Sequence, residues 1–411
     1  MSPPTTRIPT TEPAWPDPPG AEPEGRPFEP AGVAAPTAAE TDAELSELAG
    51  RRVAVALSGG VDSAVAALRL VRAGADVVGL SLRLHDPDPD HPMADRACCP
   101  PDDLQDARRI AEALDIPFYV LDGRKQFDGA VVRPFVGAYL SGRTPNPCVA
   151  CNAFVKLERL VGRARALGCE RLATGHYARS SRTSSPSGAR LFAGADSAKD
   201  QSYFLFSTPP AVLRELLFPL GAWTKDRVRE AALAAGLPVA HKLESQEVCF
   251  VGGKGAGSFV MRQPEAQGDH AGPIVDREGR VVGQHPGVMH FTVGQRKGLG
   301  VAAGERLHVL RILPEDKTVV VGTGDDLLQS GLRGHGAVWP AGAPSGPVRA
   351  RVQIRYRDPG TPATVTPLPG EGSPVEVRFD RPVRAIAPGQ ATVFRQGDQV
   401  LGGAFIAEGF A

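Results

Sequence analysis

Short, almost wholly hydrophobic runs alternate with amphipathic stretches between residue 51 and about residue 252 of the 411-residue chain. Four runs have the length and composition of buried parallel strands, at residues 52–57, 75–84, 117–122 and 169–178. Helices are predicted at residues 64–74, 102–114 and 153–167, the first ending at Gly74. Strands that alternate with helices predict a doubly wound parallel α/β sheet.

The pattern changes after about residue 252, where glycines multiply and helical periodicity fades. Short alternating runs at residues 348–356, 375–379 and 391–395 are strand-like and are separated by Pro/Gly turns. This part predicts a small central domain at residues 253–325 and a C-terminal β-barrel domain at residues 326–411, after a catalytic α/β domain at residues 51–252. Residues 180–188, rich in serine, are expected to form a flexible surface insertion.

The first 50 residues differ from the rest in composition. They hold 11 of the 39 prolines, 2 basic and 9 acidic residues, and so carry a charge of −7. We expect this tail to be disordered, because it has too little apolar surface to offset the entropy of ordering. It lacks the features of a secretory or transit peptide, which favours a cytoplasmic protein, and no apolar run is long enough to span a membrane.

The other 361 residues hold 44 basic and 37 acidic groups, a net charge of +7. A basic body is compatible with a nucleic-acid partner, although charge alone is weak support for one.

The segment S-G-G-V-D-S at residues 58–63 connects the first predicted strand to the first helix. Two glycines allow the backbone to wrap closely around an anion, and the helix start adds N–H groups and its dipole. Asp62 is a candidate for holding Mg²⁺ against bound phosphates. The segment matches neither of the common phosphate-binding fingerprints, so a simple glycine-rich turn is the alternative. It resembles the phosphate loop of the N-type ATP pyrophosphatases, Rossmann-like enzymes that cleave ATP between the α- and β-phosphates, and this resemblance does not choose the acceptor.

Six cysteines are present, and no secretion signal supports a disulfide framework. Cys148 and Cys151 form C-V-A-C just before a predicted helix, a position that favours a thiolate at Cys151, whereas Cys249 follows a polar loop. A C-x-x-C pair alone is also compatible with a redox or zinc site, or with small buried residues. Cys98 and Cys99 have no assigned role, and Cys169 is expected in the core.

Several further motifs follow in order along the chain, and together with the phosphate loop they resemble the tRNA-specific 2-thiouridylases from about residue 51 to the C-terminus. They are G-R-T-P-N-P-x-x-x-C-N, A-T-G-H-Y-A, K-D-Q-S-Y-F-L, S-Q-E-V-C-F, T-V-G-Q-R-K-G-L, I-R-Y-R and A-P-G-Q. The resemblance implies ATP-dependent 2-thiolation of the wobble uridine of tRNAs of the Lys, Glu and Gln type. ATP adenylates the position-2 oxygen, and a cysteine persulfide supplies the sulfur.

By motif position, the resemblance makes Cys249 the persulfide carrier and Cys151 the second catalytic cysteine. It leaves open whether Cys151 releases sulfide from the persulfide or the persulfide attacks directly. The implied ATP-binding residues are Ala56, Leu57, Ser58, Gly59, Gly60, Val61, Asp62, Ser63, Leu82 and Gly175. The implied tRNA-binding residues are Asn146, Pro147, Cys148, His176, Lys199, Asp200, Gln201, Arg355, Tyr356 and Gln390.

The implied partners are ATP with Mg²⁺, tRNA, and a persulfide donor or sulfur-relay protein. Some family members carry Asp at the position of Cys148, so Cys148, Cys151 and Cys249 raise the alternative of an iron–sulfur cluster. Two other functions stay open. An amidating or ligating ATP pyrophosphatase would need neither Cys151 nor Cys249, and a non-catalytic RNA-binding protein would not need an intact phosphate loop.

Overall fold

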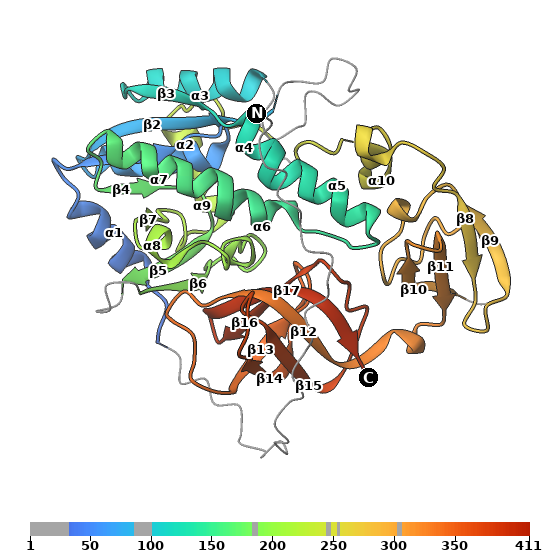
Figure 1. Ribbon diagram of the computed structural model, residues 1–411. Coiled ribbons are helices and arrows are strands. Elements are labelled where there is room, and N and C mark those ends of the chain that lie inside the picture. Colours follow the sequence, from blue (N-terminus) through green and yellow to red (C-terminus); the bar gives the residue numbers. More distant parts are fainter. Residues whose placement is uncertain (1–32, 86–100, 183–187, 244–247, 253–254, 302–305) are drawn as a thin grey trace, which may run out of the picture.

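The computed structural model describes residues 33–85, 101–182, 188–243, 248–252, 255–301 and 306–411 (Figure 1). The first part of the chain forms a five-stranded parallel sheet in the order β3-β2-β1-β4-β7. Its strands are β1 Arg52–Ala56, β2 Asp76–Arg83, β3 Phe118–Asp122, β4 Arg171–Ala173 and β7 Leu216–Leu217. The doubly wound parallel sheet predicted from the sequence is therefore confirmed.

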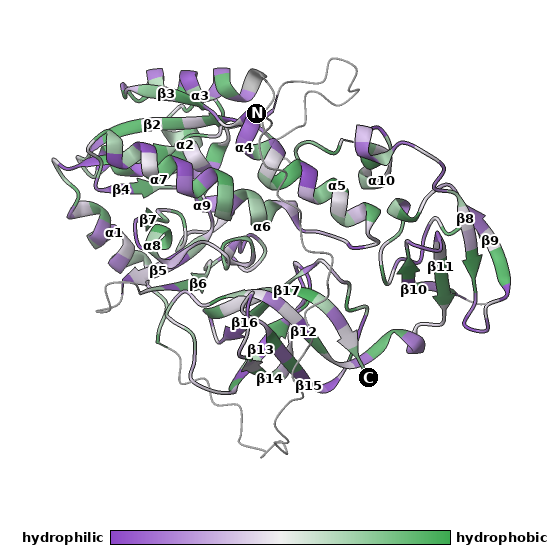
Figure 2. Ribbon diagram, in the orientation of Figure 1, coloured by the Kyte–Doolittle hydropathy of each residue, from purple (hydrophilic) through white to green (hydrophobic). Residues whose placement is uncertain are grey.

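Both faces of this sheet are covered, because alternate residues of a strand point to opposite sides. Val53 and Val55 of β1 pack in one cluster with helix α2, whereas Ala54 packs in another with helix α7. β2 is consequently buried from Val77 to Leu82, and Figure 2 shows it as largely hydrophobic. The α-helices of this part are α1 Ala38–Ser46, α2 Val61–Arg72, α3 Pro101–Ala113, α4 Arg124–Phe127, α5 Arg133–Leu140, α6 Pro147–Cys151, α7 Leu157–Ala166, α8 Pro210–Leu213 and α9 Lys225–Ala234.

Two π-helical turns interrupt these helices, η2 Asp128–Val132 before α5 and η3 Asn152–Lys156 between α6 and α7. In η3 the N–H of Leu157 bonds to the carbonyl of Asn152, five residues earlier. The segment from α6 through η3 to α7 is thus continuously helical from Pro147 to Ala166. Its helix begins six residues before the predicted start at residue 153, because Asn146 caps it and Pro147 suits the first helical position.

A smaller sheet follows, with the strand order β10-β11-β8-β9. Its strands are β8 Gly272–Val275, β9 Val281–His285, β10 His308–Leu313 and β11 Thr318–Gly322, and helix α10 Gly255–Met261 precedes them. Single 3-10 turns accompany the sheets, at η4 Ser202–Phe204, η5 Pro264–Ala266, η6 Val288–His290 and η7 Asp325–Leu327. Ile274, Phe291 and Val319 belong to a separate hydrophobic cluster of this central part.

The C-terminal part is a barrel of six strands, closed by pairing of the first strand with the last. The strands are β12 Leu328–Val338, β13 Val348–Gln353, β14 Thr361–Pro367, β15 Val375–Arg384, β16 Ala391–Gln396 and β17 Gln399–Phe410. Buried residues such as Leu332, Val377 and Phe394 fill its interior. The sequence-based prediction of a C-terminal barrel is therefore confirmed.

A hairpin of the first part extends the barrel sheet. β5 Ala178–Arg182 pairs with β6 Ala189–Ala193, and β6 pairs with β17 through Val400 and Leu191. Two sequence-based predictions are wrong here. The strand predicted at residues 169–178 ends at Ala173, where the chain turns toward α2, and residues 180–182 are in a paired strand rather than a surface insertion. Residues 183–187 lie outside the described residues.

The predicted disorder of residues 1–50 is wrong for the part that forms α1. Thr37 and Glu40 form a reciprocal capping box at its start, which follows the last proline of the tail, Pro36. Leu45 and Leu48 are 3% and 5% exposed and join the cluster of β1 and α2. Burial of these two side chains offsets the entropy cost of ordering α1. The composition of the tail did not indicate this burial. Residues 1–32 lie outside the described residues.

Candidate active site

The phosphate loop, residues 58–63, folds around the hydroxyl of Ser63. This oxygen accepts the N–H of Ser58 at 3.2 Å and donates to the carbonyl of Gly60 at 3.0 Å. Gly60 occupies the N-cap of α2 in an extended conformation, and no side chain of the described residues caps this helix. The N–H groups of the first turn of a twelve-residue helix are thereby left to bind an anion.

Two glycines of this region permit close backbone packing. Gly59 has φ +76°, and a Cβ there would lie 2.1 Å from the carbonyl oxygen of Asp103. A Cβ on Gly175 would lie 2.7 Å from the backbone nitrogen of Ser63. The turn after β4 and the start of α3 therefore both contact the phosphate loop. Leu82 is buried on β2, whose carboxyl end lies beside that of β1, the side of such a sheet where ligands bind.

Asp62, the candidate for holding Mg²⁺, contacts two other residues of the protein. Its Oδ1 accepts the hydroxyl of Tyr177 at 2.8 Å and the ammonium of Lys225 at 2.7 Å. Lys225 is buried at the first position of α9. Asp62 consequently ties the start of α2 to α9, a role that the sequence did not reveal because its partners lie far along the chain.

Lys242 is a second cation at the phosphate loop that sequence reasoning missed. Its Nζ donates to the carbonyl of Gly59 at 3.1 Å, to Asp106 at 2.6 Å and to Asp103. The two aspartates belong to α3 and are largely shielded from solvent. Lys242 thus compensates two carboxylates that would otherwise stand beside an anion-binding loop. No periodicity or motif of the sequence joins these residues.

The helix that carries C-V-A-C exposes its two cysteines differently. Asn146 caps it, accepting the N–H of Val149 at 3.4 Å. Cys148 lies in the first turn and is exposed, whereas Cys151 lies at the end of that turn and is 5% exposed. The expectation of a cysteine at the helix start therefore fits Cys148 better than Cys151.

Cys249 packs against the hydrophobic cluster that contains Cys151, and we call these two cysteines the thiol site. Phe250, its neighbour, meets the rings of Phe127 and Phe135 edge to face, with centroids 5.5 Å and 5.1 Å apart. Residues 245–247 before it lie outside the described residues, as do Cys98 and Cys99. Cys151 and Cys249 thus border one large hydrophobic cluster, which also contains Cys169, and their catalytic roles stay a prediction.

The iron–sulfur cluster raised as an alternative for Cys148, Cys151 and Cys249 stays a hypothesis. Within the described ranges, no three His, Cys, Asp or Glu side chains gather closely enough to hold a metal ion. The exposed Cys148 and the buried Cys151 also lie in different surroundings.

His176 lies next to Gly175, and its Nδ1 is 2.9 Å from the hydroxyl of Thr174. Burial, with a smaller contribution from the charge of Lys156, lowers the pKa of His176 from 6.5 to about 4. The imidazole is therefore neutral near pH 7, and it can bind a partner by hydrogen bonds but not by charge.

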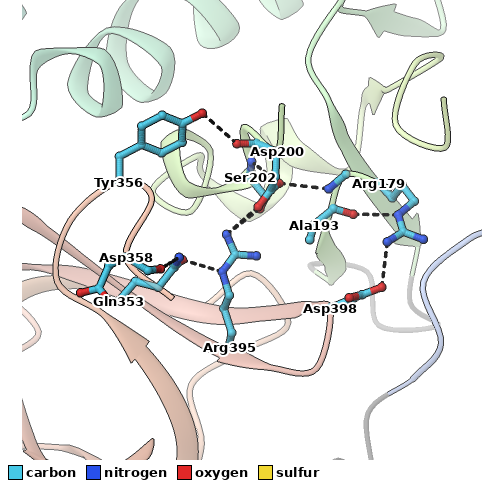
Figure 3. A network of polar contacts seen from close by, with 10 residues as sticks. Arg179, Ala193, Asp200, Ser202, Gln353, Tyr356, Asp358, Arg395 and Asp398 are labelled. Carbon is cyan, nitrogen blue, oxygen red and sulfur yellow. Dashed lines mark hydrogen bonds and ion pairs between the residues drawn. The ribbon is translucent and has the colours of Figure 1, made fainter. Parts of the chain in front are cut away.

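The residues predicted to bind tRNA divide into two groups. Arg355 is exposed, and Lys199 is half-buried. By contrast, Asp200 lies in a polar network between the first part of the chain and the barrel (Figure 3). Its Oδ2 is 2.9 Å from Arg395, and its backbone carbonyl accepts the hydroxyl of Tyr356 at 3.4 Å.

Arg395, which the sequence analysis missed, is the centre of this network. It also donates to the hydroxyl of Ser202 at 3.0 Å and to Oε1 of Gln353 at 2.6 Å. Gln201 likewise makes an internal contact, because its Oε1 accepts the N–H of Tyr177 at 3.0 Å. Gln390 donates from Nε2 to the carbonyl of Thr144 at 2.9 Å.

Three family profiles match the chain in order. They are described as a tRNA methyl transferase HUP domain at residues 51–253, a tRNA methyl transferase PRC-barrel domain at residues 261–323 and an aminomethyltransferase β-barrel domain at residues 329–406. No helix among the described residues has the length and hydrophobicity needed to cross a membrane.

Curated relatives match over almost their full length. A protein of Geotalea uraniireducens named tRNA-specific 2-thiouridylase MnmA is 45% identical over 361 residues, which cover 87% of this chain and 95% of the relative. A protein of the same name from Sorangium cellulosum is 48% identical over 358 residues, covering 86% and 91%. A third, from Geobacter metallireducens, is 44% identical over 369 residues, covering 88% and 98%.

Proposed function

The chain belongs to the family of tRNA-specific 2-thiouridylases, and we propose that its phosphate loop and thiol site carry out the family's reaction. The enzyme is an ATP-dependent tRNA-uridine 2-sulfurtransferase, which replaces the position-2 oxygen of the wobble uridine by sulfur. The observation that carries the assignment of the thiol site is that Cys151 and Cys249 reach one hydrophobic cluster from distant segments.

The chemistry divides between the two regions. At the phosphate loop, the uridine oxygen attacks the α-phosphate of ATP, pyrophosphate leaves, and the adenylated oxygen becomes a good leaving group. At the thiol site, Cys249 carries a persulfide. In one route, Cys151 attacks the inner sulfur of this persulfide and releases sulfide, which displaces AMP from the ring carbon. In the other route, the outer sulfur attacks the ring carbon and displaces AMP. Cys151 then attacks the sulfur of Cys249 and breaks its bond to the ring-bound sulfur. Both routes give thiouridine, AMP and a disulfide between Cys151 and Cys249, which an external thiol must reduce before the next turnover.

We propose that residues 56–63, with Leu82 and Gly175, bind ATP. The uncapped first turn of α2 and the close approach of Gly175 to Ser63 support this assignment. ATP is expected to bind with Mg²⁺, whose charge offsets the phosphates. Because Tyr177 and Lys225 already hold Oδ1 of Asp62, we assign Asp62 to positioning α2 rather than to direct metal binding.

For tRNA, we propose contacts by Asn146, Pro147, Cys148, His176, Lys199 and Arg355. Exposed Arg355 suits a phosphate, and Cys148 with the helix cap lies beside Cys151, where the target base must arrive. The wobble base must leave its stack to reach this buried cysteine. A persulfide donor or relay protein is the proposed sulfur source, the cytoplasm is the proposed location, and residues 51–252, 253–325 and 326–411 are the proposed domains.

The descriptions of the family profiles name methyl transfer, whereas the curated relatives name thiolation. The two cysteines at one cluster favour thiolation, because transfer of a methyl group needs neither a persulfide nor ATP cleavage.

The decisive experiment is nucleoside mass spectrometry of tRNA incubated with enzyme, ATP, Mg²⁺ and a persulfide donor. We expect 2-thiouridine, formed only with ATP and absent with Cys151→Ser or Cys249→Ser. A methylated nucleoside, or thiolation retained by both variants, would reject the proposal. Full activity of iron-free enzyme is expected, and activity that requires iron would favour the iron–sulfur cluster instead.

A further inference from the structure

We propose that Cys148 is the resolving cysteine of the reaction, which regenerates Cys249 after each turnover. This inference rests on the proposed function, because it concerns the disulfide between Cys151 and Cys249 that both routes leave behind. It adds to the expected contact of Cys148 with the target base and does not replace it, since the disulfide is resolved after the thiolated base has formed.

The two cysteines of C-V-A-C differ in their access to solvent. Cys148 is exposed, whereas Cys151 is 5% exposed and packs in the large hydrophobic cluster together with Val149. A thiol reacts with a disulfide only when it can reach one of the two sulfur atoms. A disulfide that contains Cys151 therefore presents this sulfur poorly to a reductant in solution.

Cys249 offers an external thiol a less useful point of attack. It is half-buried, and the rings of Phe127 and Phe135 pack against Phe250 beside it. An external thiol that attacked the sulfur of Cys249 would remain bound to it as a mixed disulfide. The cysteine that must accept the next persulfide would then stay blocked until a second thiol removed the first.

The spacing of Cys148 and Cys151 suits an exchange between them. They lie three residues apart on one helix, and such residues are neighbours on its surface, with Cβ atoms about 5–6 Å apart. A disulfide needs a Cβ separation of about 3.5–4.5 Å, so this turn must tighten slightly. Because the turn is the first of its helix, it adjusts more easily than a turn in the middle. Cys-X-X-Cys pairs that form and break disulfides have this same spacing.

The exchange conserves atoms and electrons. The thiolate of Cys148 attacks the sulfur of Cys151, the bond between Cys151 and Cys249 breaks, and Cys249 leaves as a thiolate that can accept the next persulfide. An external thiol then attacks the exposed sulfur of Cys148 and releases Cys151. A second external thiol releases Cys148, and the two external thiols depart as their own disulfide. The two electrons come from the external thiols that the reaction already requires.

Cys169 belongs to the same hydrophobic cluster but does not suit this role. It is 6% exposed, and burial raises the pKa of its thiol. Cys169 is therefore a poor nucleophile near pH 7. Cys169→Ala consequently serves as the matched control for Cys148→Ser, since each removes one thiol from the first part of the chain.

The first test maps the disulfide that forms in a single turnover. Full-length enzyme with a persulfide on Cys249 is mixed with ATP, Mg²⁺ and tRNA in the absence of reductant, and its disulfides are identified by peptide mass spectrometry. We expect a disulfide between Cys148 and Cys151 in the wild type and in Cys169→Ala. In Cys148→Ser we expect the disulfide between Cys151 and Cys249, and finding only this second disulfide in the wild type would overturn the proposal.

The second test compares the steady-state rate of thiolation with the rate of a single turnover at saturating tRNA. The ratio of the two rates separates regeneration of the enzyme from any effect of the substitution on the target base. At a low concentration of glutathione, we expect this ratio to fall about tenfold in Cys148→Ser, because a thiol of the same chain acts at an effective concentration in the millimolar range. A high concentration of dithiothreitol should restore most of the ratio. A ratio that matches the wild type at every glutathione concentration would contradict the resolving role.

Oxidation without substrates separates this inference from the proposed function. Oxidised glutathione added to the enzyme alone should also form the disulfide between Cys148 and Cys151, and its absence would count against the inference. Failure of the proposed function shows differently, because the wild type would then form no thiouridine in a single turnover although this disulfide forms. Iron bound at Cys148 in anaerobically purified enzyme, with thiolation lost when the iron is removed, would also overturn the resolving role.

Discussion

The phosphate loop and the thiol site are built in opposite ways. The phosphate loop is six consecutive residues, and its internal hydroxyl contacts join residues no more than five apart. The thiol site combines Cys151 and Cys249, which come from distant segments of the chain. The hydrophobic cluster around them also includes Ala391, Val393 and Val400 of the barrel, so this site depends on more than one part of the protein.

Substitution of the thiol site should give the largest effect and should separate the two regions. Cys151→Ser and Cys249→Ser are expected to abolish thiolation, because serine can neither carry a persulfide nor attack one at neutral pH. ATP and tRNA binding should stay within about twofold of wild type, as measured by equilibrium titration. Cys169→Ala, in the same cluster, is the control and should keep its activity. Loss of ATP binding in Cys151→Ser would show that the regions are not separable.

Removal of helix α1 tests whether the part that carries the phosphate loop depends for its stability on a segment outside the motif. Deletion of residues 1–50 exposes the cluster beneath Leu45 and Leu48, at about 1.5–3 kcal/mol for each leucine. It also leaves the largely buried Arg69 and Arg171 without Asp42 and Glu44. We expect a clearly lower urea midpoint. Deletion of residues 1–32 retains α1 and should leave the midpoint unchanged, and equal effects of the two deletions would contradict this account.

The ion pair of Arg395 and Asp200 joins the barrel to the first part of the chain, and we call it the domain junction. Breaking it should affect the thiol site more than the phosphate loop. Arg395→Met leaves Asp200 buried without its cation, a loss of about 3–5 kcal/mol in the free energy of unfolding. Thiolation should fall while ATP binding persists. Arg384→Met removes an exposed pair with Asp325 and should cost no more than about 1 kcal/mol. A similar cost for both variants, measured by denaturant unfolding, would show that the junction adds little.

Substitution of Lys242 should have a smaller effect, confined to ATP binding at the phosphate loop. Lys242→Met removes the ammonium group that Asp103 and Asp106 share beside the phosphate loop, although Asp106 keeps its ion pair with Arg109. We expect the Kd for ATP to rise about tenfold at low salt, within the range of close charge interactions. Addition of Asp103→Asn and Asp106→Asn should recover most of the affinity. No recovery would mean that Lys242 acts on ATP other than by balancing these charges.

The smallest effect concerns pH. Because the folded-state pKa of His176 is lowered from 6.5 to about 4, the unfolded chain takes up a proton first as the solution is acidified. The stability linked to His176 is therefore complete above pH 6.5 and is lost as the pH falls toward 4. His176→Gln should flatten this part of the pH–stability curve, measured by urea unfolding at each pH. An unchanged curve would contradict the burial of this imidazole.

Sequence patterns predicted what depends on neighbours along the chain. The strands, the helices and the phosphate loop follow from hydrophobic runs and from glycines that permit close approach. The partners of Lys242, Asp62 and Arg395 could not be predicted, because their separations of more than a hundred residues leave no periodic signal. The same reason explains why the sequence did not reveal the contacts of Asp200 and Gln390 with other parts of the protein.

The π-helical turn between α6 and α7 holds five residues where an α-helical turn would hold fewer. Deletion of one residue there would leave a continuous helix but would rotate Cys151 by about 100° around the axis relative to α7. The direction in which the Cys151 sulfur points therefore depends on the number of residues in this turn. A side-chain substitution does not change that number, so it would not reverse the rotation that a deletion causes.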